Sequence, residues 1–285
     1  MKRIVYRSLL LSTLGASLLA GLASCNKDQD FGSSTTYSAE DNSDAEGADA
    51  ATYEYVDANA PEDLSRSSSG FTGTYAPAAD LAAIGSGCAT RAYDAATRTL
   101  TITFDPSGCM GRDGRVRRGQ IVAVFSGQHR QAGSSVTVSL VNFSVNGNAH
   151  TGTRTITYTG SGVYALNVQN ASVTTPQGTA SWTSQRTYTQ TAGAGTRTIL
   201  DDEYSVTGSA SGTNRKGVSF TATIQQPLKK VFQRGCARLF TAGTVEITTS
   251  REKTLLLNYD PTGTQACDNI VSITVNGRTR TLQLR

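Results

Sequence analysis

The residues in this chain that can undergo the most kinds of covalent chemistry are its five cysteines. Cys25 lies near the N-terminus, well before the other four. Met1–Arg7 carries three basic residues and no acid, and Ser8–Leu22 is apolar or small throughout. A basic start followed by a short apolar run is typical of a secretory signal peptide. A membrane-spanning helix needs about 20 apolar residues, and this run is shorter and ends near Cys25. We therefore expect residues 1–24 to be a leader that is removed.

The residues Leu22-Ala23-Ser24-Cys25 resemble the lipobox, the cleavage and acylation signal of bacterial lipoproteins. The resemblance implies that Cys25 becomes the first residue after cleavage and carries a thioether-linked diacylglycerol and an amide-linked acyl chain. Several acyl chains anchor a protein stably, whereas one chain binds a membrane only reversibly. The membrane is therefore an expected partner, through these chains. The alternative is an ordinary secretion signal in which Cys25 has no role.

The residues after Cys25 indicate which membrane would hold the anchor. The next residue is Asn26, not the Asp that retains lipoproteins in the inner membrane of enterobacteria. The acidic residues beyond it resemble the surface-export signal of Bacteroidota lipoproteins. This resemblance implies the outer membrane, with the cell surface favoured over the periplasmic face.

The segment that follows is strongly acidic. Between Asn26 and Arg66 the chain has eleven acidic and two basic residues, a net charge of −9, whereas the chain from Ser67 onward carries +10. The segment has few apolar residues, too few to offset the entropy lost on ordering. We expect residues 25–74 to be a flexible, disordered tether with a reach of roughly 35–40 Å, followed by a folded body at 75–285. Specific binding of a partner or Ca²⁺ by the acidic run is the alternative.

The other four cysteines predict disulfides, because an even number in an exported body is typical of an oxidising compartment. An antiparallel hairpin that turns near residues 94–97 would bring Cys88 towards Cys109. A second one that turns near residues 250–253 would place Cys236 opposite Cys267. These are the two expected pairs, and cross-bridging between the two hairpins is the alternative.

Catalytic motifs are scarce. The only histidines are His129 and His150, and a nucleophilic serine needs both a base and a group that orients the base. The sequence has no Gly-x-Ser-x-Gly elbow, phosphate loop or dinucleotide fingerprint. It also lacks a Cys-x-x-Cys pair for zinc. We expect no catalytic residue, metal or cofactor, and no nucleic-acid partner.

One basic cluster is a candidate binding site. It consists of Arg112, Arg115, Arg117 and Arg118. Guanidinium groups recognise oxyanions by paired hydrogen bonds, so the cluster could hold an anionic glycan, another anionic envelope polymer or the acidic segment of the same chain. The alternative is a basic loop and strand edge that only discourages aggregation.

Alternating residues predict an all-β body. Thr, Val, Ile and Tyr dominate the runs, as expected for a half-buried pleated surface. Threonines at every second position between 151 and 159 would leave Ile156 and Tyr158 for the core. The predicted strands are 101–104, 120–125, 135–145, 153–159, 164–173, 181–188, 204–208, 218–224, 244–248, 254–259, 271–275 and 279–284. One short helix is predicted at 77–84.

The turns between these strands are short. Asn146-Gly147 and Asn276-Gly277 are the strongest hairpin signals, because a type I′ turn needs a positive φ at both central residues, and Pro176-Gln177-Gly178 is a third candidate. The apolar residues change parity at Leu140-Val141, which predicts a β-bulge. Short connections favour a long antiparallel meander. Because such a sheet must cover its apolar face, we expect a sandwich or a closed or partly closed barrel.

Several stretches of the body resemble uncharacterised lipoproteins of Bacteroidota. These stretches are Cys109 with residues 111–121, residues 142–147, residues 201–208 and residues 267–285. The resemblance implies a lipid-anchored envelope protein with a β-rich body and transfers no catalytic residue. We interpret the chain as a noncatalytic binding or structural module of unknown oligomeric state. The alternative is an accessory glycan-processing hydrolase. A deep cleft with a perturbed carboxylate or histidine would favour the enzyme, and exposed aromatics such as Trp182 would favour binding.

Overall fold

The computed structural model of the chain describes residues 31, 33–61, 87–111, 113–196, 198–233, 236, 240–251 and 253–284. They form one 13-stranded antiparallel sheet in which each strand pairs with its neighbours in sequence, and one long helix, α1 (Ser33–Asn59). The strands are β1 (Ala89–Asp94), β2 (Thr99–Met110), β3 (Val116–Phe125), β4 (Ser135–Val145), β5 (Asn148–Gly160), β6 (Val163–Thr175), β7 (Gly178–Ala192), β8 (Glu203–Thr213), β9 (Ser219–Val231), β10 (Phe240–Thr249), β11 (Thr254–Asn258), β12 (Ile270–Val275) and β13 (Arg278–Gln283). A short 3-10 helix, η2 (Ile199–Asp201), precedes β8.

The predicted meander is confirmed, because all twelve predicted strands correspond to β2–β13. Asn146 and Gly147 have φ values of 50° and 80°, and Asn276 and Gly277 have 50° and 75°, so both predicted hairpin turns have the required positive φ. A register shift in β4 between Val141 and Ser144 confirms the predicted bulge. The sequence pattern does not predict β1, because this edge strand is mostly exposed and has no buried apolar row. The helix predicted at 77–84 lies outside the described residues.

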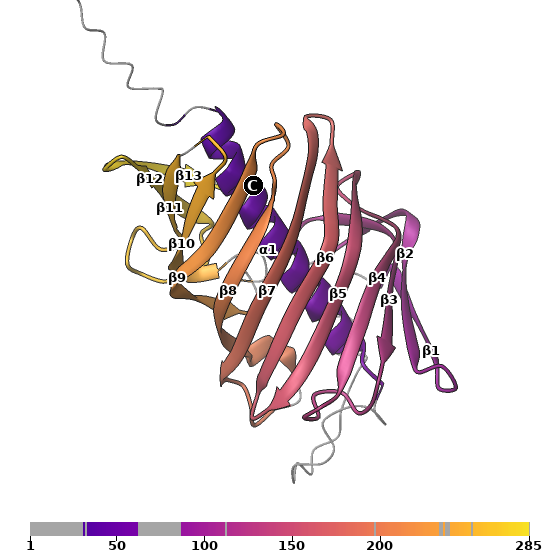
Figure 1. Cartoon of the computed structure of the whole chain (residues 1–285). Helices are drawn as coiled ribbons and strands as arrows, with labels where there is room; N and C mark the ends of the chain where they lie inside the picture. The colour runs from indigo at the N-terminus through magenta and orange to yellow at the C-terminus, as the bar shows by residue number, and fades with distance from the viewer. Residues whose placement is uncertain are drawn as a thin grey trace, which may run out of the picture.

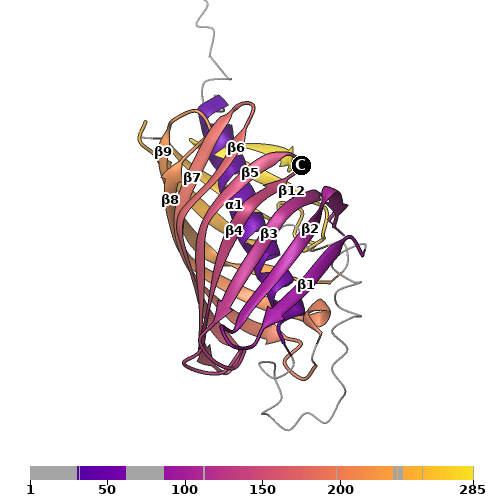
Figure 2. The same ribbon diagram turned by 90° about the vertical axis from the view of Figure 1, so that its right-hand side faces the viewer.

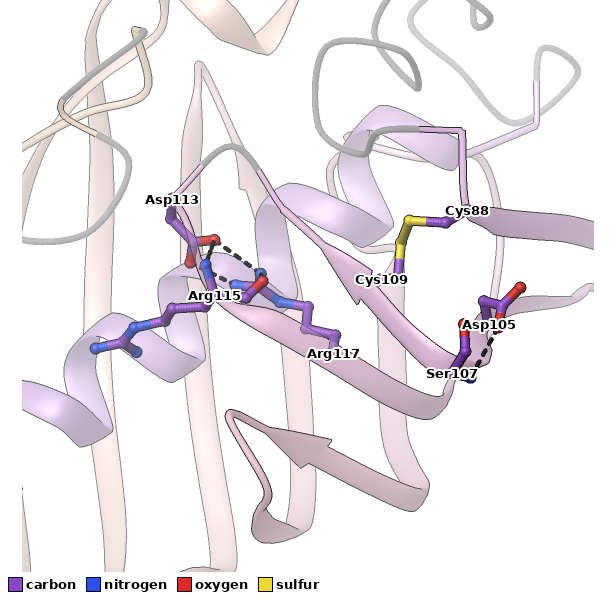
Figure 3. Close-up of a disulfide and its surroundings, with 7 residues drawn as sticks. All are labelled: Cys88, Asp105, Ser107, Cys109, Asp113, Arg115 and Arg117. Atoms are coloured by element: carbon purple, nitrogen blue, oxygen red, sulfur yellow. Dashed lines mark hydrogen bonds and ion pairs between the residues drawn. A yellow bond between two sulfur atoms is a disulfide. The ribbon is translucent and has the colours of Figure 1, made fainter.

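Both predicted disulfides are present. Cys88 bonds to Cys109, with 5.3 Å between their Cα atoms, and Cys236 bonds to Cys267, with 4.8 Å. The first bond ties the residue before β1 to the end of β2 (Figure 3). Each bridge links the two sides of a hairpin, as the hairpin registers require.

The sheet is strongly curved and is not closed, since β1 and β13 lie at opposite ends of the strand order. Figure 1 shows α1 running obliquely across the sheet, behind β4–β9. Figure 2 shows the helix between the β1–β6 flank and the β9–β13 flank. The two flanks thus face each other with the helix between them, which fits the sandwich form of the predicted fold. The described strands do not form a closed barrel.

Helix α1 contradicts part of the predicted tether. It spans 27 residues of the acidic segment, and most of its described side chains are buried. The prediction of a flexible segment is therefore wrong for Ser33–Asn59. That prediction rested on composition alone. Composition does not take into account the side chains of the sheet that contact this segment and stabilise it as a helix. The remainder of 25–74, apart from Phe31, Ala60 and Pro61, lies outside the described residues, as does the leader.

Nothing within α1 explains why it is helical. Its residues include seven acids and no Lys or Arg, and its apolar residues do not gather on one side. Such a helix has no favourable i,i+4 ion pairs, and many of its residues are Ser, Thr, Asn and Asp, which are weak helix formers. Contacts with the sheet must therefore supply its stability.

These contacts are buried ion pairs. Each of four acids on α1 meets an arginine of the sheet or its loops: Asp41 with Arg215, Glu46 with Arg186, Asp49 with Arg154, and Asp57 with Arg130. The Asp49–Arg154 pair has an N–O distance of 2.9 Å and the Asp57–Arg130 pair one of 2.6 Å. Removing one partner leaves a desolvated charge without compensation, which is strongly destabilising. Helix and sheet can thus bury these charges only together.

Aromatic packing completes the interface. The Tyr53 ring on α1 stacks on Tyr164 of β6 at a centroid distance of 4.6 Å, and Tyr164 stacks on Tyr188 of β7 at 4.7 Å. Tyr55 packs edge-on against Phe104 at 5.2 Å. Offset stacked and edge-to-face pairs are the favoured geometries of aromatic rings. The second half of α1 is therefore fixed by rings as well as by charges.

We expect Glu46→Gln to lower the free energy of unfolding by about 3–5 kcal/mol, because it leaves the buried Arg186 without its carboxylate. Urea denaturation at constant pH measures this change. Glu246→Gln is the matched control, because Glu246 faces solvent on β10 and its loss should cost less than about 0.5 kcal/mol. Equal effects of the two substitutions would show that the Glu46 pair does not hold the helix.

Candidate functional site

A cavity of about 360 Å³ lies beside the N-terminal half of α1. This volume is within the range of small-molecule sites. Its walls come from α1, from the loop before β3, and from the β4–β5, β6–β7 and β8–β9 hairpins. The lining residues that bear on its chemistry are Asp44, Arg115, Asn148, His150, Trp182 and Arg215. Below, this cavity is called the hairpin pocket.

The loop before β3 positions Arg115. Gly111 donates its N–H to the Arg115 carbonyl at 2.9 Å, and the Asp113 carboxylate accepts the Arg115 N–H at 3.1 Å. Asp113 also holds the Arg117 guanidinium by two hydrogen bonds of 2.8 and 2.6 Å. In Figure 3 the Arg117 side chain points back towards Asp113, whereas Arg115 extends away from both. The loop therefore directs Arg115 alone into the hairpin pocket.

The β8–β9 turn positions Arg215 on the opposite wall. Asn214 donates from Nδ2 to the Ser38 hydroxyl at 2.9 Å, which ties the turn to α1. The Arg215 N–H donates to Asp41 at 2.7 Å, and its guanidinium pairs with the same carboxylate. The turn and the helix thus fix the Arg215 head group from two directions.

Asp44 lies between the two arginines. Its Oδ1 is 3.4 Å from Nη2 of Arg115, and its Oδ2 is 4.0 Å from Nη2 of Arg215. The Asp44 side chain is 47% exposed, whereas that of Asp41 is 5% exposed. Asp44 is therefore a carboxylate at the open side of the pocket, with one guanidinium near each oxygen.

His150 and Trp182 form the deeper part of the hairpin pocket. Burial, reinforced by Arg154, Arg115 and Arg117, lowers the pKa of His150 to about 3, so its ring is neutral at pH 7. The Trp182 indole donates to Asp49 at 3.1 Å. Trp182 is 5% exposed and lines a cavity, so it is not the exposed aromatic on a flat face that would have favoured a binding module.

The predicted basic cluster does not form a single patch among the described residues. Arg117 is buried against Asp113, and its guanidinium lies 5.0 Å from the Tyr55 ring centroid. Arg118 donates to the carbonyls of Pro106 and Ser107 at 3.0 and 2.9 Å. Arg112 lies outside the described residues. Of the predicted cluster, only Arg115 lines the pocket, and its role in anion binding stays a prediction.

Sequence reasoning included the acidic segment among the anions that the cluster could hold, and Asp44 of that segment lies 3.4 Å from Arg115, but it missed Arg215. Arg215 and Asp44 are about 100 and 70 positions away from Arg115 in the chain, so no local motif joins the three residues. The available signal was the turn sequence Asn214-Arg215-Lys216-Gly217, which places two bases at a hairpin tip. The missing fact was that an acidic helix lies beside that tip.

A second buried polar network lies at the C-terminal end of α1. Asp57 accepts from Arg130 through both oxygens at 2.6 Å and contacts Nε2 of His129 at 2.7 Å. Nδ1 of His129 is 3.2 Å from the Tyr158 hydroxyl. Arg130 also reaches Asp202 at 3.1 Å, and Tyr204 donates to the same carboxylate at 3.1 Å. This network joins the helix end to the β3–β4 and β7–β8 connections.

The two carboxylates that share Arg130 have opposite pKa shifts. Burial acts to raise the pKa of Asp57, but Arg130 and the hydrogen bond with His129 outweigh it and lower the pKa to about 2. Burial raises the pKa of Asp202 to about 7, with Arg130 opposing and the Asp57 charge reinforcing the rise. One guanidinium thus compensates Asp57 fully and Asp202 only in part. Both carboxylates are buried and share Arg130, so we interpret the network as a structural latch.

Comparisons of the chain with protein-family models, curated protein sequences and solved structures found no match in any of the three. Within the described ranges, no group of three or more His, Cys, Asp or Glu side chains is arranged to hold a metal ion. None of the described helices combines the length and the apolar character that crossing a bilayer requires.

The latch predicts a pH dependence of stability. An ordinary Asp, with a pKa of about 3.8, has lost its proton by pH 5, whereas folded Asp202 retains it up to about pH 7. The folded state then binds more protons than the unfolded state, so the free energy of unfolding should fall as the pH rises from about 4 to 7. The slope from this group is at most roughly 1.4 kcal/mol per pH unit. Asp57 acts in the opposite sense, and its contribution is lost only below about pH 4, as the pH falls towards its folded pKa of about 2.

Urea denaturation at several pH values from 4 to 8 measures this slope. Asp202→Asn should flatten it between pH 4 and 7, because the amide does not titrate. Asp94→Asn is the matched control, since Asp94 is exposed at the end of β1 and its carboxylate accepts hydrogen bonds from Ala96 and Thr97 of its own turn. A slope that survives Asp202→Asn would assign the titration to another group.

Proposed function

We propose that this chain is a lipid-anchored protein of the outer membrane, attached through Cys25, whose β body binds an anionic glycan or a similar envelope polymer without converting it. The observation that carries the binding part is the convergence of Arg115 and Arg215 in the hairpin pocket. Two guanidinium groups from different elements, aimed at one point, suit an oxyanion with two oxygens. The cell surface remains the favoured side of the membrane.

His150 is a perturbed histidine in a cavity, a feature expected of an enzyme, but the direction of its shift does not suit acid catalysis. The pKa of His150 is about 3, so this ring is neutral and cannot serve as a proton donor near neutral pH. Asp113 and Asp41 are each engaged with an arginine. Burial opposes the ionisation of Asp113, yet its hydrogen bond with Arg117 and the Arg117 charge prevail and lower its pKa. His150 is therefore neutral and Asp113 is ionised near pH 7. Neither group is poised to exchange a proton with a ligand at that pH.

The docked helix places the body close to its anchor. Cys25 precedes Ser33, the first residue of α1, by eight residues, and eight residues span at most about 30 Å when fully extended. The hairpin pocket lies beside the N-terminal half of α1. It should therefore be on the membrane-proximal side of the body, where polymers attached to the membrane surface begin.

The anchor is tested by metabolic labelling with a fatty acid in an organism that processes lipoproteins. We expect the full chain to be labelled and Cys25→Ala to be unlabelled, because Cys25 supplies the only thioether site in the lipobox. Asn26→Ala is the neighbouring control and should keep the label. Labelling of Cys25→Ala, or an unmodified N-terminus in the mass spectrum of the parent protein, would refute the anchor.

The ligand class is tested by fluorescence, since Trp182 is the only tryptophan and it lines the hairpin pocket. Titration with tetragalacturonate should change its emission saturably, and less steeply at high salt. Arg115→Gln should weaken binding about tenfold or more, the equivalent of one charge-assisted hydrogen bond.

Arg118→Gln is the matched control, because Arg118 binds backbone carbonyls and is not among the pocket residues. Its affinity should equal that of the parent. Maltotetraose, which is neutral, should not bind. Equal binding of both sugars would show that the pocket does not recognise charge.

A further inference from the structure

Asp44 differs from the buried acids that α1 presents to arginines and resembles Glu40, whose side chain is 35% exposed and lies 3.6 Å from Nη2 of Arg215. The side chains of Asp41, Glu46, Asp49 and Asp57 are 4–6% exposed in their ion pairs, whereas that of Asp44 is 47% exposed. The Asp44 contacts of 3.4 and 4.0 Å are also longer than the 2.6 and 2.9 Å of the Asp57 and Asp49 pairs. Exposed ion pairs with long contacts contribute little to stability. These two contacts of Asp44 therefore contribute little to holding the helix in place.

The position of Asp44 is that of a bound carboxylate. Arg115 lies near one of its oxygens and Arg215 near the other, and these arginines come from separate loops. Arg215 has Asp41 as its closer partner, so the Asp44 carboxylate can move towards solvent while Arg215 stays fixed. The space between the two guanidinium groups would then be open to another anion from the pocket side.

The surroundings favour an anion at this point. Burial is the main cause of the low pKa of His150, and the charges of Arg154, Arg115 and Arg117 lower it further, so positive charge lies close to this wall of the hairpin pocket. Asp41 and Asp113 already pair with arginines. If Asp44 moved away, its negative charge would be lost from the space that Arg115 faces. A ligand carboxylate in that space would replace the lost negative charge beside Arg115.

We propose that Asp44 is a built-in competitor that occupies the anion position of the hairpin pocket, and that the carboxylate of an acidic sugar displaces it to bind between Arg115 and Arg215. This inference rests on the proposed function and names the ligand group and the residue that opposes it. The remainder of the sugar would lie along Asn148 and Gln177, whose side-chain amides both donate to and accept from hydroxyl groups and which line the same cavity.

The test compares the full-length parent with Asp44→Asn in the Trp182 titration with tetragalacturonate. Asp44→Asn removes the competing charge and keeps the size of the side chain. A ligand that must displace an internal group binds with an affinity reduced by the fraction of open sites. We expect Asp44→Asn to lower the Kd by about fivefold or more, the usual size of coupling between linked groups.

Two controls separate this effect from a general change of charge. Asp105→Asn alters the net charge equally, at an exposed turn outside the pocket, and should change the Kd less than about twofold. The methyl ester of tetragalacturonate lacks the carboxylate and should bind neither protein. Because His150 is one of only two histidines, its imidazole resonance provides a second readout: a bound carboxylate should raise its pKa in Asp44→Asn, where no carboxylate occupies the position beforehand.

The outcomes distinguish the two proposals. Tighter binding by Asp44→Asn, or binding by Asp44→Asn when the parent shows none, supports the built-in competitor. An unchanged or higher Kd for Asp44→Asn, with saturable binding by the parent, overturns the competitor and leaves the proposed function standing. The absence of saturable binding to both proteins overturns both. Equal tightening by Asp105→Asn would also overturn the competitor, because the effect would then be one of net charge.

Discussion

The burial of arginines against an acidic helix is the constraint on which this structure depends. Arg154 and Arg186 point into the concave side of the sheet and are almost completely buried, a position that a guanidinium occupies only with a partner. Helix α1 brings carboxylates to both and, with no base of its own, has no other means of compensating its charge. Neither layer can fold well without the other, so helix formation and closure of the core are one event.

The sheet could be predicted from the sequence because its signals are local. Alternation of Thr with apolar residues reports which side of a strand is buried, and Asn-Gly pairs report the turn that joins two strands. Both signals lie within fewer than ten residues of sequence. They therefore do not depend on how distant parts of the chain are arranged. The disulfides followed for a related reason. Cys88 and Cys109 lie on the two sides of one hairpin, whose register places Cys88 beside Asp105, and the irregularity of β2 between Phe104 and Cys109 closes the remaining distance.

The helix and the pocket could not be predicted in this way, because their signals are not local. Residues 33–59 have the composition of a disordered segment, and only the sheet makes them a helix. One clue was present, since Arg154 shares its strand parity with Ile156 and Tyr158, both of which are buried. An arginine in a core-facing row requires a distant carboxylate. If this requirement is applied to the sequence, the acidic segment is expected to pack against the basic body and not to act as a spacer.

The acids of α1 have two different roles, and these roles determine which substitutions the pocket can tolerate. The buried acids cannot be substituted without leaving a buried charge unpaired, so they fix the helix and, with it, the walls of the hairpin pocket. Asp44 sits on the same helix, is half exposed and contributes little to holding it. Substitutions at Asp44 can therefore alter what the pocket accepts while the fold keeps its stability. Stability and ligand preference thus depend on different residues of one helix. The buried acids hold the helix in place, and the helix in turn positions Asp44, so a substitution at Asp44 can change ligand preference without loss of the core.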